Sequence, residues 1–151
     1  MPHVGCCLLP ASCSRCEILL EGEGPWRLDG TPVAGGGGGS SPEPSSRGGG
    51  DDVQLLFTPG HTRGCVSLLH RPSRALFSGD TLAWSARLGR LTIFRAYNWH
   101  SVAQQLASVA ALRGANFLHV LPGHGRRAAF PDAAAREAAM AEMLAAEGHT
   151  G

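Results

Sequence analysis

Three apolar runs in this chain each lead into a glycine-containing turn that carries a histidine or an aspartate. The turns lie within Phe57–Thr62 (FTPGHT), Leu76–Leu82 (LFSGDTL) and Leu121–Gly125 (LPGHG). Short apolar runs bounded by glycine and proline are typical of buried strands. Strands of an α/β sheet present their chemistry at their carboxyl ends. The pattern therefore predicts an α/β fold in which three polar side chains are presented from three strand ends.

The chain has 151 residues, which suits one domain, and its composition divides it into unequal parts. We expect residues 1–15 to be a poorly ordered N-terminus and residues 16–148 to form the domain. Within the domain, residues 34–50 include five consecutive glycines and no apolar side chain larger than proline. Such a segment cannot bury surface, so we expect a flexible Gly/Ser/Pro loop inserted between two strands.

Hydrophobic patterning predicts the secondary structure of the remaining chain. Short apolar runs bounded by turn residues predict four strands, at 53–58, 65–70, 75–78 and 116–121. Ser101 and Asp132 are the expected N-caps of two helices, which end near Arg113 and at Ala146. Residues 81–97 are interpreted as a long connection, and Cys65 as a small buried residue within its strand.

Charge and hydropathy exclude some classes of function. The formal net charge is +1, so no basic surface for nucleic acid or an acidic membrane is expected. No run approaches the roughly 18 apolar residues of a membrane span. The apolar patch near the N-terminus is not preceded by Lys or Arg, so we expect no signal peptide. Cys13 and Cys16 have the spacing of half a zinc knuckle, but no second pair follows, and we interpret them as reduced thiols.

The three turns supply His61, Asp80 and His124. Taken singly, each has an ordinary interpretation, as a solvated loop histidine or a turn aspartate. Together, two histidines and one aspartate at strand ends are ligand types that zinc and iron prefer. Zinc is the expected metal, with iron or manganese as alternatives, because such sites accept several metals. The remaining histidines of the second part of the chain are interpreted as outside the site: His70, His100, His119 and His149.

The set TPGHT, FSGDTL and LPGHG resembles the metallo-β-lactamase superfamily, in the hydrolase branch that includes glyoxalase II-like enzymes. The resemblance covers about Val53 to Arg127. It implies that His61 binds a first metal, that the catalytic Asp80 bridges two metals, and that His124 binds the second. It also implies a small-molecule substrate and attack by water on an ester, thioester or related bond.

A further similarity, around Tyr97-Asn98 and in Glu21–Trp26, resembles a plant and cyanobacterial-type branch. Some members of that branch carry a ferredoxin-like N-terminal part. The resemblance is compatible with the cytoplasm or a plastid, and the sequence leaves the localisation open.

The chain also departs from the superfamily pattern. The His-x-His-x-Asp-His cluster that should precede these motifs does not occur, and His3 is the only histidine upstream of them. Each metal would then keep two protein ligands, whereas a catalytic zinc site holds three and a water. We expect weak metal binding and little or no activity from this chain alone. The resemblance implies the C-terminal half of an αβ/βα sandwich, with a mixed sheet and two helices.

Three hypotheses follow, so whether the chain is an enzyme stays open at this point. The first is a metal-dependent hydrolase of which this chain forms the C-terminal part. The second is a degenerate, non-catalytic domain that binds a partner. The third is a split enzyme whose first half comes from another chain. In each case an uncovered apolar sheet face would favour self-association or docking of a complementary half-domain.

Overall fold

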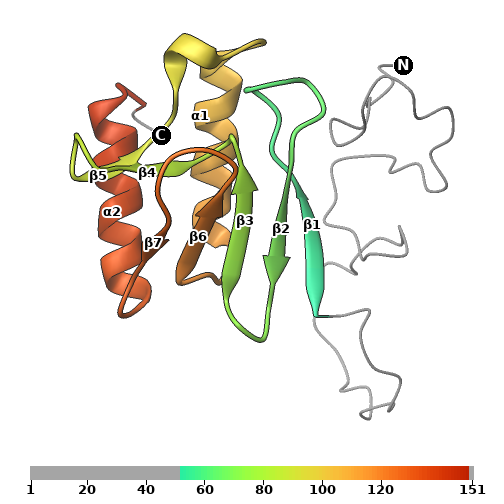
Figure 1. The fold of residues 1–151 in the computed structure, drawn as a ribbon, viewed down its shortest axis with the longest axis vertical. Coiled ribbons are helices and arrows are strands. Elements are labelled where there is room, and N and C mark those ends of the chain that lie inside the picture. The colour runs from blue at the N-terminus through green and yellow to red at the C-terminus, as the bar shows by residue number, and fades with distance from the viewer. Residues whose placement is uncertain (1–51, 150–151) are drawn as a thin grey trace, which may run out of the picture.

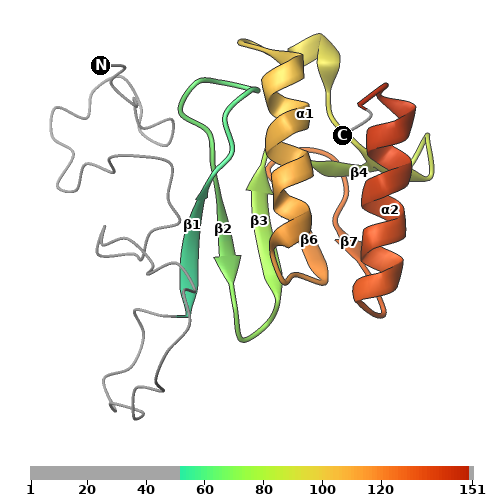
Figure 2. The ribbon, with the colours of Figure 1, turned by 180° about the vertical axis from the view of Figure 1, so that it is seen from behind.

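The computed structural model describes residues 52–149, which form a mixed five-stranded sheet with two helices on one face (Figures 1 and 2). In chain order the elements are β1 (Val53–Phe57), β2 (Val66–His70), β3 (Ala75–Gly79), β4 (Ala83–Ser85), β5 (Arg90–Thr92), η1 (Arg95–Tyr97), α1 (Val102–Ala111), η2 (Leu112–Gly114), β6 (His119–Pro122), β7 (Ala128–Ala129) and α2 (Ala133–Ala146). The predicted α/β class with a mixed sheet and two helices is confirmed. The predictions for residues 1–15 and 34–50 lie outside the described residues.

The direction of the strands determines where the three turns lie. The strand order is β1-β2-β3-β6-β7, with antiparallel pairing throughout except for the parallel pair β3 and β6. Therefore β1, β3 and β6 all run the same way, and their carboxyl ends share one edge of the sheet. The chain returns from β3 to β6 through α1, as a parallel pair requires a long crossover.

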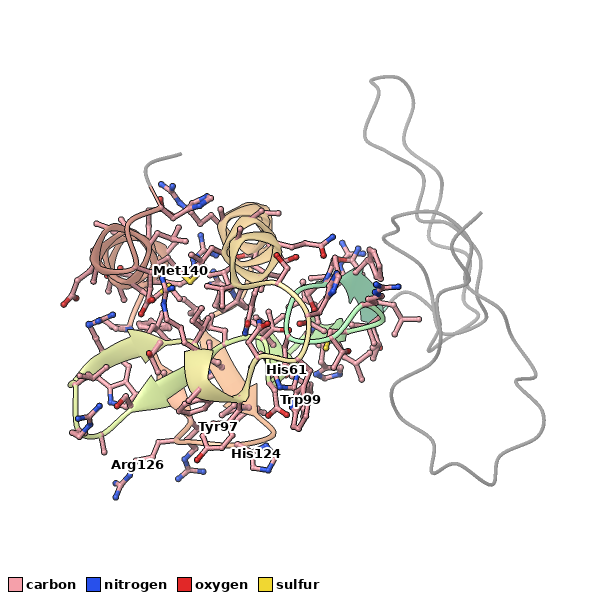
Figure 3. All side chains as sticks on the ribbon, turned by 90° about the horizontal axis from the view of Figure 1, so that it is seen from above. His61, Tyr97, Trp99, His124, Arg126 and Met140 are labelled. Carbon is pink, nitrogen blue, oxygen red and sulfur yellow. The ribbon has the colours of Figure 1, made fainter. Side chains whose placement is uncertain are left out.

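The hydrophobic core lies between the sheet and the two helices. Figure 3 shows Met140 of α2 in this layer, and it is fully buried. Strands and helices contribute alternate or helically spaced side chains to the core, each of which stabilises the fold by about 1.5–3 kcal/mol. They include Leu69, Leu76, Leu106, Val109, Phe117, Val120, Met140 and Met143.

Both helices begin at the residues that the sequence predicts. The Ser101 hydroxyl accepts a hydrogen bond from the Gln104 amide at 3.2 Å, and Asp132 accepts one from the Ala135 amide at 2.8 Å. Between α2 and η2, Arg113 donates to Glu137 at 2.7 Å and holds the pKa of that carboxyl below its ordinary value. Any stabilisation from this exposed pair is present above the usual glutamate pKa and is lost as the pH falls.

Three predictions of local structure are wrong. Residues 81–97 are not a bare connection, because β4 and β5 form a hairpin there, followed by η1. These strands have three residues each, which is too short for a visible alternation of apolar side chains. The second correction concerns β6, which begins at His119 and not at Asn116, since Phe117 enters the core before pairing starts.

Cys65 is the third correction. It precedes β2 and is only partly buried, so it is not a packed residue inside the strand. Its Sγ atom lies 3.0 Å from the Thr62 hydroxyl and 3.9 Å from Nδ1 of His61. The turn before β2 therefore places Cys65 next to the loop that carries His61.

The second face of the sheet carries no helix among residues 52–149. The strand register places Leu55 opposite Leu68, Leu68 opposite Phe77, and Phe77 beside Leu121. Neighbours such as Leu69 and Leu76 point into the core, so this row points the other way. We call these four residues the open-face row, and its Phe77 is 46% exposed. No helix within residues 52–149 is both long and apolar enough to cross a membrane.

The core assignment predicts a contrast between two phenylalanines. Phe117 is fully buried and lies under the Arg136 guanidinium, 5.0 Å from the ring centre. Phe117→Ala is expected to lower the free energy of unfolding by about 3–5 kcal/mol, because it leaves a cavity. Phe77→Ala, the matched control, should lower the free energy of unfolding by clearly less. Urea unfolding followed by circular dichroism measures both, and equal losses would contradict the assigned core.

Candidate metal centre

The structure brings His61, Asp80 and His124 to one cavity of about 420 Å³. His61 follows β1, Asp80 follows β3 and His124 follows β6, so the shared sheet edge collects them as the sequence predicts. Figure 3 shows His61 and His124 on the same side of the molecule. The remaining lining comes from three aromatic residues: Phe94, Tyr97 and Trp99. The ligand role of the three polar residues stays a prediction.

Asp80 and His124 are in direct contact. The Oδ1 atom of Asp80 lies 2.7 Å from Nδ1 of His124. The two loops are joined by the Gly123 amide, which donates to the Gly79 carbonyl at 2.8 Å. A Cβ atom on Gly123 would stand 3.2 Å from Asp80 Oδ1, so glycine permits this approach. The contact occupies Nδ1 of His124, so Nε2 is the ring nitrogen that remains for a ligand or a proton.

The His61 loop is fixed against α1 by a glycine. Gly60 has φ of 137°, and a Cβ atom there would lie 2.1 Å from the backbone nitrogen of Gln105. Only a residue without a side chain permits this approach. The carbonyl groups of Gly60 and His61 accept hydrogen bonds from the amides of Ser101 and Trp99, each at 2.9 Å.

Two amide side chains that the sequence analysis missed connect the loops. Asn98 donates through Nδ2 to the Gly60 carbonyl at 2.9 Å and to Gln105 Oε1 at 2.7 Å. Gln105 is 1% exposed and donates through Nε2 to the carbonyls of Asp80 and Thr81, both at 3.0 Å. One signal could have found Gln105, because it shares the apolar face of α1 with residues three and four positions away.

The described donor set is too small for a catalytic zinc ion. Among residues 52–149, no group of three His, Cys, Asp or Glu side chains could hold a metal ion. Asp80 and His124 contact one another, and a catalytic zinc needs three protein ligands. The described residues therefore do not fit such a metal by themselves.

A larger cavity, of about 810 Å³, lies where β1 and β2 face α1 and η2. Its lining contains one acidic residue, Asp52, and one basic residue, Arg71, and the described lining includes no histidine or cysteine. It offers no cluster for metal binding or nucleophilic attack, so the smaller cavity is the candidate site.

No family model matches the chain, and no curated protein matches it either. Solved structures of metallo-β-lactamase proteins do match it. A family member from Thermus thermophilus is 21% identical with a TM-score of 0.46, covering 64% of this chain and 30% of its own. An archaeal superfamily member from Sulfolobus tokodaii is 22% identical with a TM-score of 0.44, covering 61% and 33%.

A metallo-β-lactamase from Pontibacter korlensis is 15% identical with a TM-score of 0.44, and the match covers 76% of this chain. The match spans about half of that protein (51%), and about a third of the other two. All three TM-scores are below 0.5.

The close approach at Gly60 gives a testable prediction. Gly60→Ala is expected to lower the free energy of unfolding by about 3 kcal/mol or more, because it combines backbone strain with a clash against α1. Gly89→Ala is the matched control, since Gly89 also has positive φ (66°) but no atom stands within 4 Å of its Cβ position. Gly89→Ala should lower the free energy of unfolding by only about 1–2 kcal/mol. If urea unfolding showed equal losses of unfolding free energy for the two variants, the close contact between Gly60 and α1 would be contradicted.

Proposed function

We propose that this chain carries the incomplete, C-terminal half of a metallo-β-lactamase-type hydrolase site. One observation carries the proposal: His61, Asp80 and His124, chosen from their motifs, line a single cavity at one sheet edge. Two histidines and one aspartate are ligand types that zinc prefers, which supports a shared metal-binding role. Ligands from outside residues 52–149 would complete the set, either from this chain or from another.

The proposed reaction class is attack by water on an ester, thioester or related bond of a small molecule. The motifs support the hydrolase branch with glyoxalase II-like enzymes, and zinc is the proposed metal. His61, Asp80 and His124 supply part of its ligands, with Asp80 as the proposed catalytic residue. Since these donors alone do not fit a catalytic metal, we assign no reaction step to residues 52–149 and expect little activity from the chain alone.

Zinc binding tests this assignment. The full chain should bind Zn²⁺ weakly in equilibrium dialysis, and Asp80→Asn and His124→Ala should each weaken that binding further, by at least about tenfold. His70→Ala is the matched control, because the His70 side chain contacts Ser73, 2.6 Å away, outside the candidate site. Zinc binding that survives both site substitutions would show that these residues are not ligands.

A second function, a non-catalytic domain that binds a partner, has its own support. The described residues hold no group of three metal-binding side chains, and the open-face row exposes apolar surface. We infer that a second sheet packs on this face, as the αβ/βα resemblance implies. If that sheet belongs to another chain, it could bring the missing ligands and form a split enzyme, or it could serve binding alone.

The open-face row gives a prediction about association. If no second sheet of the same chain covers the row, the purified chain should self-associate, because large apolar patches favour contact. Phe77→Glu should shift the mass toward the monomer in light scattering, since it places a charge in the centre of the row. Leu88→Ala, which removes an exposed apolar side chain elsewhere, is the control. A self-associated state that Phe77→Glu leaves unchanged would contradict this use of the face.

A further inference from the structure

Two aromatic side chains are more exposed than any other large apolar side chain of residues 52–149. Trp99 is 81% exposed and Tyr97 is 68% exposed. Single exposed apolar residues are common, but these two line the same cavity as His61, Asp80 and His124. Clustered exposed aromatic surface beside polar groups is typical of a binding site.

The segment from Phe94 to Trp99, here called the aromatic segment, contacts both loops that carry the histidines. The Trp99 amide donates to the His61 carbonyl at 2.9 Å, and the Asn98 side chain donates to Gly60. On the other side, Phe94 packs closely on the loop that carries His124, since a Cβ atom on Gly125 would lie 2.9 Å from Phe94 Cζ. These contacts fix the backbone of residues 94–99 relative to the two loops that carry the histidines.

The cavity is lined by both polar and apolar side chains. Asp80 and the two histidines are the polar residues, and Phe94, Tyr97 and Trp99 are the aromatic ones. None of the described residues that line it is an arginine or lysine. Arg126 lies near His124 in the chain, but its side chain extends outward, away from His61 and Trp99 (Figure 3). The lining favours a ligand with a flat apolar group over a strongly anionic one.

We propose that Trp99 and Tyr97 form the binding wall for a planar apolar group of the ligand. This inference rests on the proposed function, because it places the bond to be cleaved beside His61, Asp80 and His124. The substrate class is then an ester or thioester that carries an aromatic or similarly flat group next to that bond. The volume of about 420 Å³ suits a small molecule of this kind.

The test measures binding of an uncleaved probe, 2-naphthylacetamide, to the full 151-residue chain. Isothermal titration calorimetry gives the affinity, and nitrogen-15 NMR follows the indole N–H of Trp99, assigned with Trp99→Phe. We expect the probe to bind more tightly than hexanamide or acetamide. Trp99→Ala and Tyr97→Ala should each weaken it about 3- to 10-fold. Phe77→Ala, the control, removes an exposed aromatic side chain outside the cavity and should change the affinity less than about twofold.

Several results would overturn the inference. One is that 2-naphthylacetamide does not bind, and another is that hexanamide binds equally well. A third is that Trp99→Ala and Tyr97→Ala leave the affinity for the probe unchanged and the probe does not shift the indole N–H signal of Trp99. A change of mass in light scattering for Trp99→Ala, without a change in probe affinity, would instead assign the aromatic residues to a protein interface. The exposure of Trp99 makes loss of folding in Trp99→Ala unexpected, and circular dichroism checks it.

The two proposals fail in different ways. Binding of 2-naphthylacetamide requires no metal, so it survives if the chain takes up no Zn²⁺. In that case the aromatic wall stands as a binding site, and the hydrolase assignment is the part that fails. Conversely, Zn²⁺ uptake that depends on Asp80, with no binding of the probe, would leave the proposed function standing and overturn the aromatic wall.

Discussion

The contact between Gly60 and the start of α1 is the constraint on which the candidate site depends. The backbone of Gln105 occupies the space where a side chain at Gly60 would stand. From the same place, the Gln105 side chain reaches the carbonyl of Asp80, while Asn98 connects Gln105 to Gly60. One buried amide thus joins the loops that follow β1 and β3, and the helix acts as the shared support of both.

Among residues 52–149, the proposed site has fewer metal-binding side chains than a catalytic zinc ion requires. The carboxyl ends of β1, β3 and β6 meet at one edge, and their loops place two histidines and one aspartate around one cavity. Nevertheless, Asp80 contacts His124 directly, and no third metal-binding side chain of residues 52–149 joins them. The proposed function therefore requires further ligands from outside residues 52–149. No helix of residues 52–149 covers the open-face row, and its Phe77 is 46% exposed.

The aromatic segment gives the cavity an apolar lining next to its polar residues. The backbone of Trp99 is hydrogen-bonded to the His61 loop, and the side chains of Tyr97 and Trp99 line the same cavity as the polar residues. Their exposure costs little in folding, because they take no part in the core. The same cavity thereby brings two histidines and an aspartate next to exposed aromatic side chains.

The sequence by itself determined the features that depend on near neighbours in the chain. Apolar runs and turn residues located most strands, Ser101 and Asp132 marked the helix starts, and the motifs identified His61, Asp80 and His124. Tertiary structure decided the hairpin of β4 and β5, the position of Cys65, the Asp80–His124 contact and the role of Gln105. These features arise from packing between segments far apart in the chain. Local patterns of hydrophobicity can mark a residue such as Gln105 as buried, but they do not specify which distant groups it contacts.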